Sequence, residues 1–92
     1  MSTLPPDPTS LIDYPSAFPI KVMGLAVDGF EAEMVAIALR FDPTFDVALI
    51  ERRPSKAGNY LGLTLTVLAT SREQLDDLYR TLSSHPMVKV VL

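Results

Sequence analysis

The clearest pattern in the 92-residue chain is a strict alternation of side chains over residues 61–69. Every second residue there is apolar: Leu61, Leu63, Leu65, Val67 and Ala69. Between them stand Gly62, Thr64, Thr66 and Leu68. A period of two predicts a β-strand with one buried face and one half-polar face. The glycine-containing segment 56–59 comes directly before it, so we expect this strand to be the second arm of a hairpin.

Three further strands are predicted around it. Alternation places the first at residues 18–27, with five residues facing the core: Phe18, Ile20, Val22, Gly24 and Ala26. Gly24 in mid-strand indicates a bulge or the close approach of a helix. Residues 47–53 form the second strand, closed by Pro54, and residues 87–92 form the last.

Two amphipathic helices separate these strands. We expect Asp28 to cap the first, with Glu31 completing a capping box, and Pro43 to end it. Its apolar stripe is Phe30, Met34, Ile37, Ala38 and Phe41. Thr70 and Glu73 are expected to cap the second helix, which Pro86 ends. Its stripe is Leu75, Leu78, Tyr79 and Leu82.

The element order is therefore βαββαβ. Right-handed crossovers turn this order into a four-stranded antiparallel sheet with both helices on one face and strands one and three in the centre. The predicted fold class is α+β, in the ferredoxin-like arrangement.

Composition limits the organisation of the chain. A proline-rich, flexible arm over residues 1–17 precedes one domain over residues 18–92, and we expect Leu11, Ile12 and Tyr14 to attach the arm to it. The sequence has no cysteine, no apolar run of membrane-spanning length and no pattern of a signal peptide, so a cytoplasmic setting is predicted. The net charge of −3 argues against a general binder of polyanions.

The sheet face without helices is the main candidate interface. It is expected to carry Lys21, Met23, Leu25, Tyr60, Gly62, Thr64, Thr66, Leu68, Met87, Lys89 and Val91. Met23, Leu25 and Leu68 would form an apolar patch, which is typical of an interface, with Tyr60, Thr64 and Thr66 beside it. A homodimer or another protein partner is predicted.

Three other features carry weaker chemical signals. Gly24, Asp28 and Gly29 surround the start of the first helix, a place where ligands bind, although the Asp28 carboxylate opposes anions. Arg52, Arg53 and Lys56 could hold a phosphate or carboxylate, although such charge runs are commonly solvated. His85, the only histidine, is expected to act as a cation at the end of the second helix.

The composition of the open face argues against RNA binding. RNA-recognition domains of this topology stack bases on aromatic residues of strands one and three. Here strand one offers Lys21, Met23 and Leu25, and strand three offers only Tyr60. No catalytic, metal-binding or cofactor-binding set of residues is predicted.

Four segments together resemble the YbeD-like family of small uncharacterised bacterial proteins. They are Phe18-Pro-Ile-Lys-Val-Met-Gly24, Ser55-Lys-Ala-Gly-Asn-Tyr60, Leu78-Tyr79 and Val88-Lys-Val-Val-Leu92. The resemblance covers residues 11–92 and implies a ferredoxin-like fold similar to ACT regulatory domains. Such domains usually pair and bind small effectors near an interface and the first strand-to-helix loop, which corresponds to Gly24, Asp28 and Gly29 here.

These observations lead to three hypotheses about function. The first is a non-enzymatic regulatory or adaptor module that acts through protein–protein contacts. The second is an ACT-like sensor of an amino acid or another metabolite. The third is an enzyme that uses Arg52, Arg53, Lys56 and Asn59 on a phosphate or carboxylate, and it lacks a base or nucleophile in the sequence.

Overall fold

The computed structural model describes residues 13–92 as one sheet with two helices. The elements are β1 (Ser16–Leu25), α1 (Phe30–Phe41), a 3-10 helix (Val47–Leu49), β2 (Glu51–Pro54), β3 (Tyr60–Ala69), α2 (Arg72–Ser83) and β4 (Val88–Val91). The strands lie in the order β2-β3-β1-β4, and each neighbouring pair is antiparallel. The predicted ferredoxin-like fold, with strands one and three in the centre, is confirmed.

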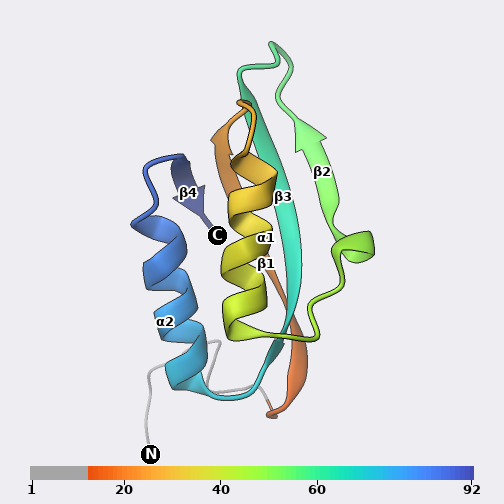
Figure 1. Cartoon of the computed structure of the whole chain (residues 1–92), viewed down its shortest axis with the longest axis vertical. Coiled ribbons are helices and arrows are strands. Elements are labelled where there is room, and N and C mark those ends of the chain that lie inside the picture. Colours follow the sequence, from red (N-terminus) through yellow and green to blue (C-terminus); the bar gives the residue numbers. More distant parts are fainter. Residues whose placement is uncertain (1–12) are drawn as a thin grey trace, which may run out of the picture.

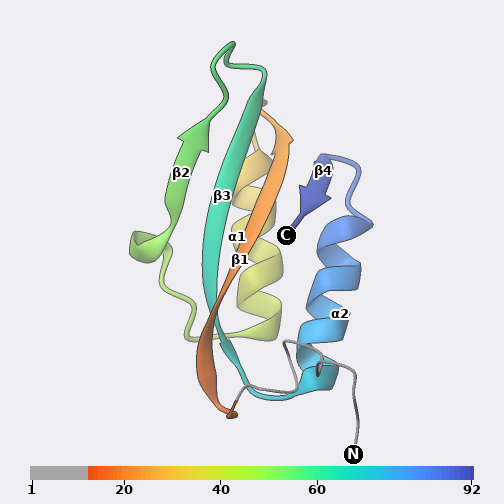
Figure 2. The same cartoon turned by 180° about the vertical axis from the view of Figure 1, so that it is seen from behind.

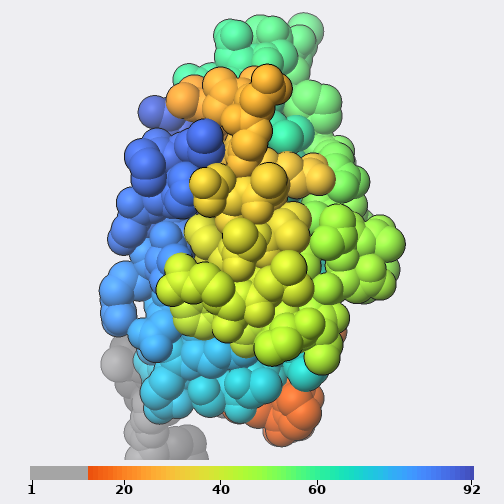
Figure 3. Space-filling model, in the orientation of Figure 1, coloured from red at the N-terminus to blue at the C-terminus, as the bar shows by residue number. Residues whose placement is uncertain are grey.

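Both helices lie on the same side of the sheet. Figure 1 shows α1 and α2 in front of the strands, and the reverse view in Figure 2 shows β1 and β3 with no helix over them. The space-filling view shows the two helices packed side by side, with the turn between β2 and β3 extending beyond them (Figure 3). No helix among residues 13–92 is long and apolar enough to cross a membrane.

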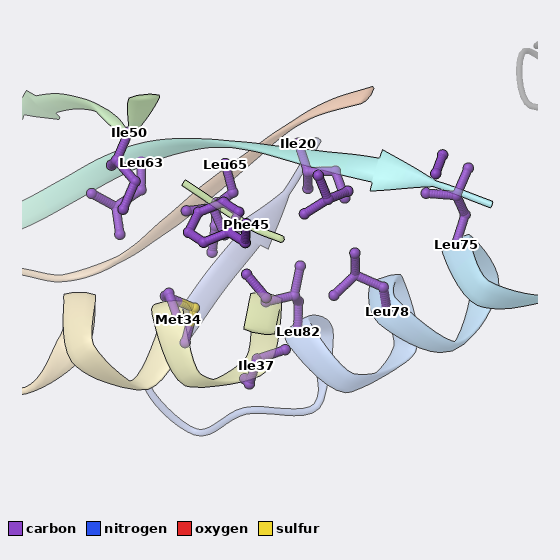
Figure 4. Packing of buried hydrophobic residues seen from close by; sticks show 14 of the residues in the cluster. Ile20, Met34, Ile37, Phe45, Ile50, Leu63, Leu65, Leu75, Leu78 and Leu82 are labelled. Carbon is purple, nitrogen blue, oxygen red and sulfur yellow. The ribbon is translucent and has the colours of Figure 1, made fainter. Parts of the chain in front are cut away.

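The core lies between this helical layer and the sheet. The alternation in β3 places Leu63, Leu65, Val67 and Ala69 at 0–1% exposure, as predicted. The predicted helix stripes meet them, with Met34 and Ile37 from α1 and Leu75, Leu78 and Leu82 from α2 pointing toward the strands (Figure 4). Periodic apolar residues in three separate segments therefore build one continuous core.

The first strand occupies a window shifted from the predicted one. It starts at Ser16 and ends at Leu25, so the predicted range of residues 18–27 was wrong at both ends. The Val27 N–H bonds to Leu25 O at 2.9 Å, a tight turn that takes the chain out of the sheet, and Ala26 is exposed rather than in the core. Phe18 is half-buried against the core.

The beginning of the chain is only partly described. Leu11 and Ile12 lie outside the described residues, so their predicted attachment to the domain stays a prediction. Tyr14 is half-buried and packs against the core cluster. Ser16 and Ala17, which the sequence placed in the arm, belong to β1.

Both predicted helix caps were displaced by one residue. The N-cap of α1 is Gly29, which has a φ of 89° and makes no side-chain capping bond, so Asp28 is not the cap. Glycine takes this left-handed conformation without steric cost. Ser71 caps α2 by accepting a bond from Gln74 N, and Gln74 Oε1 accepts from Thr70 N. The start of α2 is therefore capped by Ser71 and Gln74 in place of the predicted Thr70 and Glu73.

The second strand is shorter than predicted. Residues 47–49 were expected to be extended, but they form a 3-10 turn because the Asp46 side chain accepts a bond from Ala48 N. β2 then begins at Glu51 and includes Pro54.

Two polar side chains form hydrogen bonds between the helical layer and the sheet near the end of α1. Asp42, 5% exposed, accepts bonds from Leu68 N at 2.8 Å and from the backbone and hydroxyl of Thr44. Gln74 Nε2 donates to Phe41 O and Leu68 O. Burial raises the pKa of the Asp42 carboxyl, but the hydrogen bonds from Thr44 and Leu68 outweigh this effect and hold the pKa below its usual value.

Candidate functional site

The helix-free side of the sheet, which we call the open face, is defined by the pairing of the strands. Residues opposite each other in antiparallel strands point to the same side. One row across the open face contains Arg53 of β2, Gly62 of β3, Met23 of β1 and Val90 of β4. Met23 is 44% exposed and Val90 is 43% exposed. The middle of the sheet thus presents apolar side chains to solvent.

The adjacent row is more polar. It contains Glu51 of β2, Thr64 of β3, Lys21 of β1 and Leu92. Lys21 and Leu92 exchange two backbone hydrogen bonds of 3.1 and 2.7 Å, which places Leu92 beside β1. Charged and apolar groups therefore meet over a short stretch of the sheet.

A bulge in β4 changes which of its residues reach the open face. Gly24 pairs with Val88 and Met23 pairs with Val90, so one extra residue, Lys89, is inserted between the paired positions. The shift places Val90 on the open face and turns Val91 toward the core, where Met87 also packs. The prediction that Met87 and Val91 lie on the open face was therefore wrong, whereas the bulge signalled by Gly24 is present.

A hollow of about 660 Å³ lies on the open face. Its lining includes three predicted interface residues, Met23, Tyr60 and Thr64, together with Lys21, Glu51 and Arg53. This volume falls within the range of roughly 300–1,000 Å³ that is typical of ligand pockets. The hollow therefore brings three of the predicted interface residues together at one concave surface.

The predicted apolar patch of Met23, Leu25 and Leu68 is divided by the register. Leu68 pairs with Ala17, so it lies six residues along β1 from Met23, a distance of roughly 20 Å at the usual rise of a strand. Leu25 pairs with Tyr60 and stays close to Met23. Thr66 and Leu68 lie toward the opposite end of β3 and do not line the hollow.

The predicted ligand loop is closed on its inner side. A Cβ at Gly24 would lie 2.3 Å from both Met87 O and the Phe30 ring, so these groups fill the space beside the glycine. Asp28 and Gly29 are exposed, and Gly29 makes the turn into α1. The structure therefore separates Gly24, which is buried, from the other two residues of this candidate site.

The three predicted anion-binding cations are also separated. Arg52 points to the helical side, where its Nη2 donates to Glu31 Oε2 at 2.9 Å and its Nε donates to Glu31 Oε1. These bonds lower the pKa of the Glu31 carboxyl. Arg53 lines the hollow on the open face, which Arg52 also borders, and Lys56 lies in the turn between β2 and β3. Neighbouring residues of a strand point to opposite faces, which is why Arg52 and Arg53 diverge.

His85 joins the end of α2 to the neighbouring elements. Its Nδ1 accepts a bond from Met87 N at 3.1 Å, and its Nε2 lies 3.9 Å from Glu33 Oε2. Neither partner is a nucleophile. Among residues 13–92, no group of three or more His, Cys, Asp or Glu side chains is arranged to hold a metal ion.

Sequence comparison assigns the chain to a family. The model described as "Protein of unknown function (DUF493)" matches residues 9–92. The chain belongs to the DUF493 family. A UPF0250 protein of Leptothrix cholodnii is 70% identical over 95% of this chain and 96% of its own length. A UPF0250 protein of Bordetella pertussis is 61% identical over the full length of both chains.

Structural comparison relates the DUF493 chain to ACT domains. The crystal structure of the ACT domain from GTP pyrophosphokinase of Chlorobium tepidum covers 84% of this chain and 97% of its own, with a TM-score of 0.63 and 15% identity. An identity this low establishes similarity of fold alone. The resemblance to the YbeD-like family and to the ACT-like fold is confirmed.

Two members of the candidate site were missed from the sequence. Val90 was assigned to the wrong face because the bulge in β4 reverses the alternation after Val88. Glu51 was not singled out in the sequence, although the parity that it shares with Arg53 would have placed it on the open face. Gly24 signalled a bulge, but not which residue of β4 it would move.

Proposed function

We propose that this DUF493 protein is a non-enzymatic regulatory or adaptor module that acts by binding another protein through the open face of its sheet. The observation that supports this function best is the group of exposed apolar residues in the lining of the hollow, Met23, Tyr60 and Val90, on a side that no helix covers. Apolar groups grouped in this way favour burial against a partner.

The edge strands are poorly suited to pairing with another strand, which favours the open face over a sheet edge as the binding surface. β2 and β4 each have four residues, and β2 ends in Pro54 while β4 carries Lys89. Short edge strands, prolines and lysines are the devices that discourage pairing with another strand. A second copy and a different protein are both partners that the open face could receive.

The test compares two exposed apolar residues on opposite sides of the molecule. Met23, 44% exposed, is replaced by Glu on the open face, and Leu39, 40% exposed on α1, is replaced by Glu as a matched control. We expect affinity capture from a bacterial lysate, and any self-association that the wild type shows in sedimentation, to be lost with Met23→Glu and kept with Leu39→Glu. Thermal unfolding establishes that both variants are folded.

Two results would contradict the proposal. One is equal capture and self-association by the wild type and by Met23→Glu, which places any interface elsewhere. The other is a wild-type protein that neither captures a partner nor associates with itself.

An ACT-like sensor of a small effector is a second candidate, supported by the structural similarity to the ACT domain of the GTP pyrophosphokinase. A ligand that binds only the folded state raises the melting temperature. A rise with one amino acid or metabolite would favour the sensor, and its loss in Asp28→Ala would place the ligand at the start of α1. The closed space beside Gly24 weighs against a site there.

A further inference from the structure

The charges of the protein are distributed unequally between its two layers. The strands carry four cations, Lys21, Arg52, Arg53 and Lys89, and one acid, Glu51. The helices carry five acids, Glu31, Glu33, Glu73, Asp76 and Asp77, and three arginines, Arg40, Arg72 and Arg80. A protein with a net charge of −3 therefore has a positive sheet and a negative helical layer.

Two of the strand cations stand at the hollow without a counter-ion. Lys21 and Arg53 both line it, and within residues 13–92 neither forms an ion pair. Arg52 also borders the hollow, but it is held by Glu31 on the helical side. Glu51 is the single acidic side chain in the lining of the hollow. Lys21 and Arg53 thus stand on the open face outside the ion pairs of the described residues.

The residues between these two cations are small or apolar. Gly62 lies between Arg53 and Met23 in one row of the sheet, and Lys21 lies in the next row. A Cβ at Gly62 would have only one atom within 4 Å, Arg53 O at 3.4 Å, so there is free space in the hollow beside Gly62. From the usual rise and spacing of strands, the Cα atoms of Lys21 and Arg53 are roughly 12 Å apart.

We propose that the open face binds an acidic segment of a partner protein in an extended conformation. Two carboxylates four residues apart along the segment span about 13 Å in an extended chain, so they match Lys21 and Arg53. The residue midway between them points to the same side and lies over Gly62 against Met23. An apolar side chain at that middle position completes the motif. This inference rests on the proposed function, because it specifies the chemistry of the partner at the same face.

Charge complementarity favours this occupant over a second copy of the chain. Two identical open faces would each bring the cations Lys21 and Arg53 and only one acidic side chain, Glu51, so they complement each other in charge less well than an acidic segment does. A nucleic acid would also supply negative charge, but the face has a single aromatic residue, Tyr60, for base stacking, and the net charge is negative.

The first experiment uses a designed probe and the full-length, ¹⁵N-labelled protein. The probe is the acetylated, amidated peptide Glu-Ser-Leu-Ser-Glu, and the matched peptides are Lys-Ser-Leu-Ser-Lys and Gln-Ser-Leu-Ser-Gln. In a titration followed by amide chemical shifts, we expect saturable shifts at Met23, Arg53 and Gly62 with the Glu peptide only. The affinity should weaken as the salt concentration rises.

Charge reversal then identifies the anchors. The double variant Lys21→Glu, Arg53→Glu should lose at least about tenfold in affinity for the Glu peptide, because opposite charges become like charges. The double variant Arg40→Glu, Arg80→Glu changes the net charge equally but alters only the helices, and it should bind as the wild type does. The inference is wrong if the open face gives no saturable shifts, if the three peptides bind equally, or if both double variants bind alike.

Capture experiments separate this inference from the proposed function. A partner that is lost with Met23→Glu but kept with Lys21→Glu, Arg53→Glu supports the open face as the interface and overturns the acidic segment. A partner that is kept by both variants overturns both proposals. Loss of the partner with both variants, together with weaker capture by the wild type at high salt, supports both.

Discussion

The two faces of the sheet are built from the same strands but have opposite relations to their surroundings. On β1, Ile20 and Val22 face the helices and are 0% and 1% exposed. Lys21 and Met23, their neighbours in the chain, face solvent. The inner face is filled to the point that Gly24 has no room for a methyl group. The outer face has a hollow of about 660 Å³.

This difference separates inner-face residues, whose side chains are constrained by packing, from open-face residues, whose side chains are not. A side chain on the inner face contacts both helices and the neighbouring strands, so its volume is set by close packing. Exposed side chains such as Met23 and Val90 stabilise the fold little, and their apolar surface remains available to a partner. Pairs of similar residues, one on each face, therefore test the comparison directly.

Two glycines provide the pair with the largest expected difference. Gly24→Ala places a methyl group 2.3 Å from Met87 O and the Phe30 ring, and a backbone carbonyl cannot move aside cheaply. We expect a loss of about 3 kcal/mol in the free energy of unfolding, as for an overpacked core. Gly62→Ala meets only Arg53 O at 3.4 Å and should be close to neutral. Urea unfolding of both variants measures the difference, and equal stabilities would show that the inner face is not tightly packed at Gly24.

The inner face is also the part of the molecule that the sequence predicted best. Alternation in β3 and the helical stripes of α1 and α2 identified the buried residues, because burial imposes a period of two on a strand and of about 3.6 on a helix. The element order then limited the topology to the ferredoxin-like arrangement. These signals extend over many residues, so errors of one or two positions at the ends did not change the fold.

The sequence was less informative where a single local contact decides the structure. Residues 47–49 have β-forming side chains, but one bond from Ala48 N to the Asp46 carboxylate turns them into a 3-10 helix. One inserted residue at Lys89 placed Val90 on the open face and turned Val91 toward the core, the reverse of the predicted alternation. The hollow depends on this register across all four strands, so neither its lining nor the separation of Leu68 from Met23 could be predicted from periodicity alone.

Two aspartates, one buried and one exposed, test how much a buried carboxylate contributes to the free energy of unfolding. Asp42 is 5% exposed and accepts bonds from Leu68 and Thr44, whereas Asp46 is exposed and accepts one bond from Ala48 N. Asp42→Asn replaces an acceptor by a donor that faces other donors, so we expect a loss of about 1.5 kcal/mol at neutral pH. Asp46→Asn keeps a good capping group and should cost less. Denaturant unfolding at pH 7 compares the two.

Acid should remove the difference between the wild type and Asp42→Asn. The folded-state pKa of Asp42 is lower than its usual value, so its stabilising contribution is complete above the unfolded-state pKa of about 3.9. It is lost as the pH falls from that value through the lower pKa of the folded state. The stabilities of the two proteins should therefore converge as the pH is lowered from 5 toward 2. A difference that stays constant over this range would mean that the ionised carboxylate is not the source of the stabilisation.

Two adjacent arginines give the smallest expected effect and the finest test of the comparison. Arg52 bonds to Glu31 on the helical side, and Arg53 stands on the open face without an ion pair in the described part of the chain. Exposed ion pairs stabilise proteins little, so we expect Arg52→Ala to lower the melting temperature by about 1–4 °C and Arg53→Ala to leave it unchanged. The effect of Arg52→Ala should shrink in 1 M salt, which screens the pair. If Arg53→Ala destabilises the protein as much as Arg52→Ala does, then Arg53 contributes to the fold, and the division between a packed face and a face free for binding fails at this edge of the sheet.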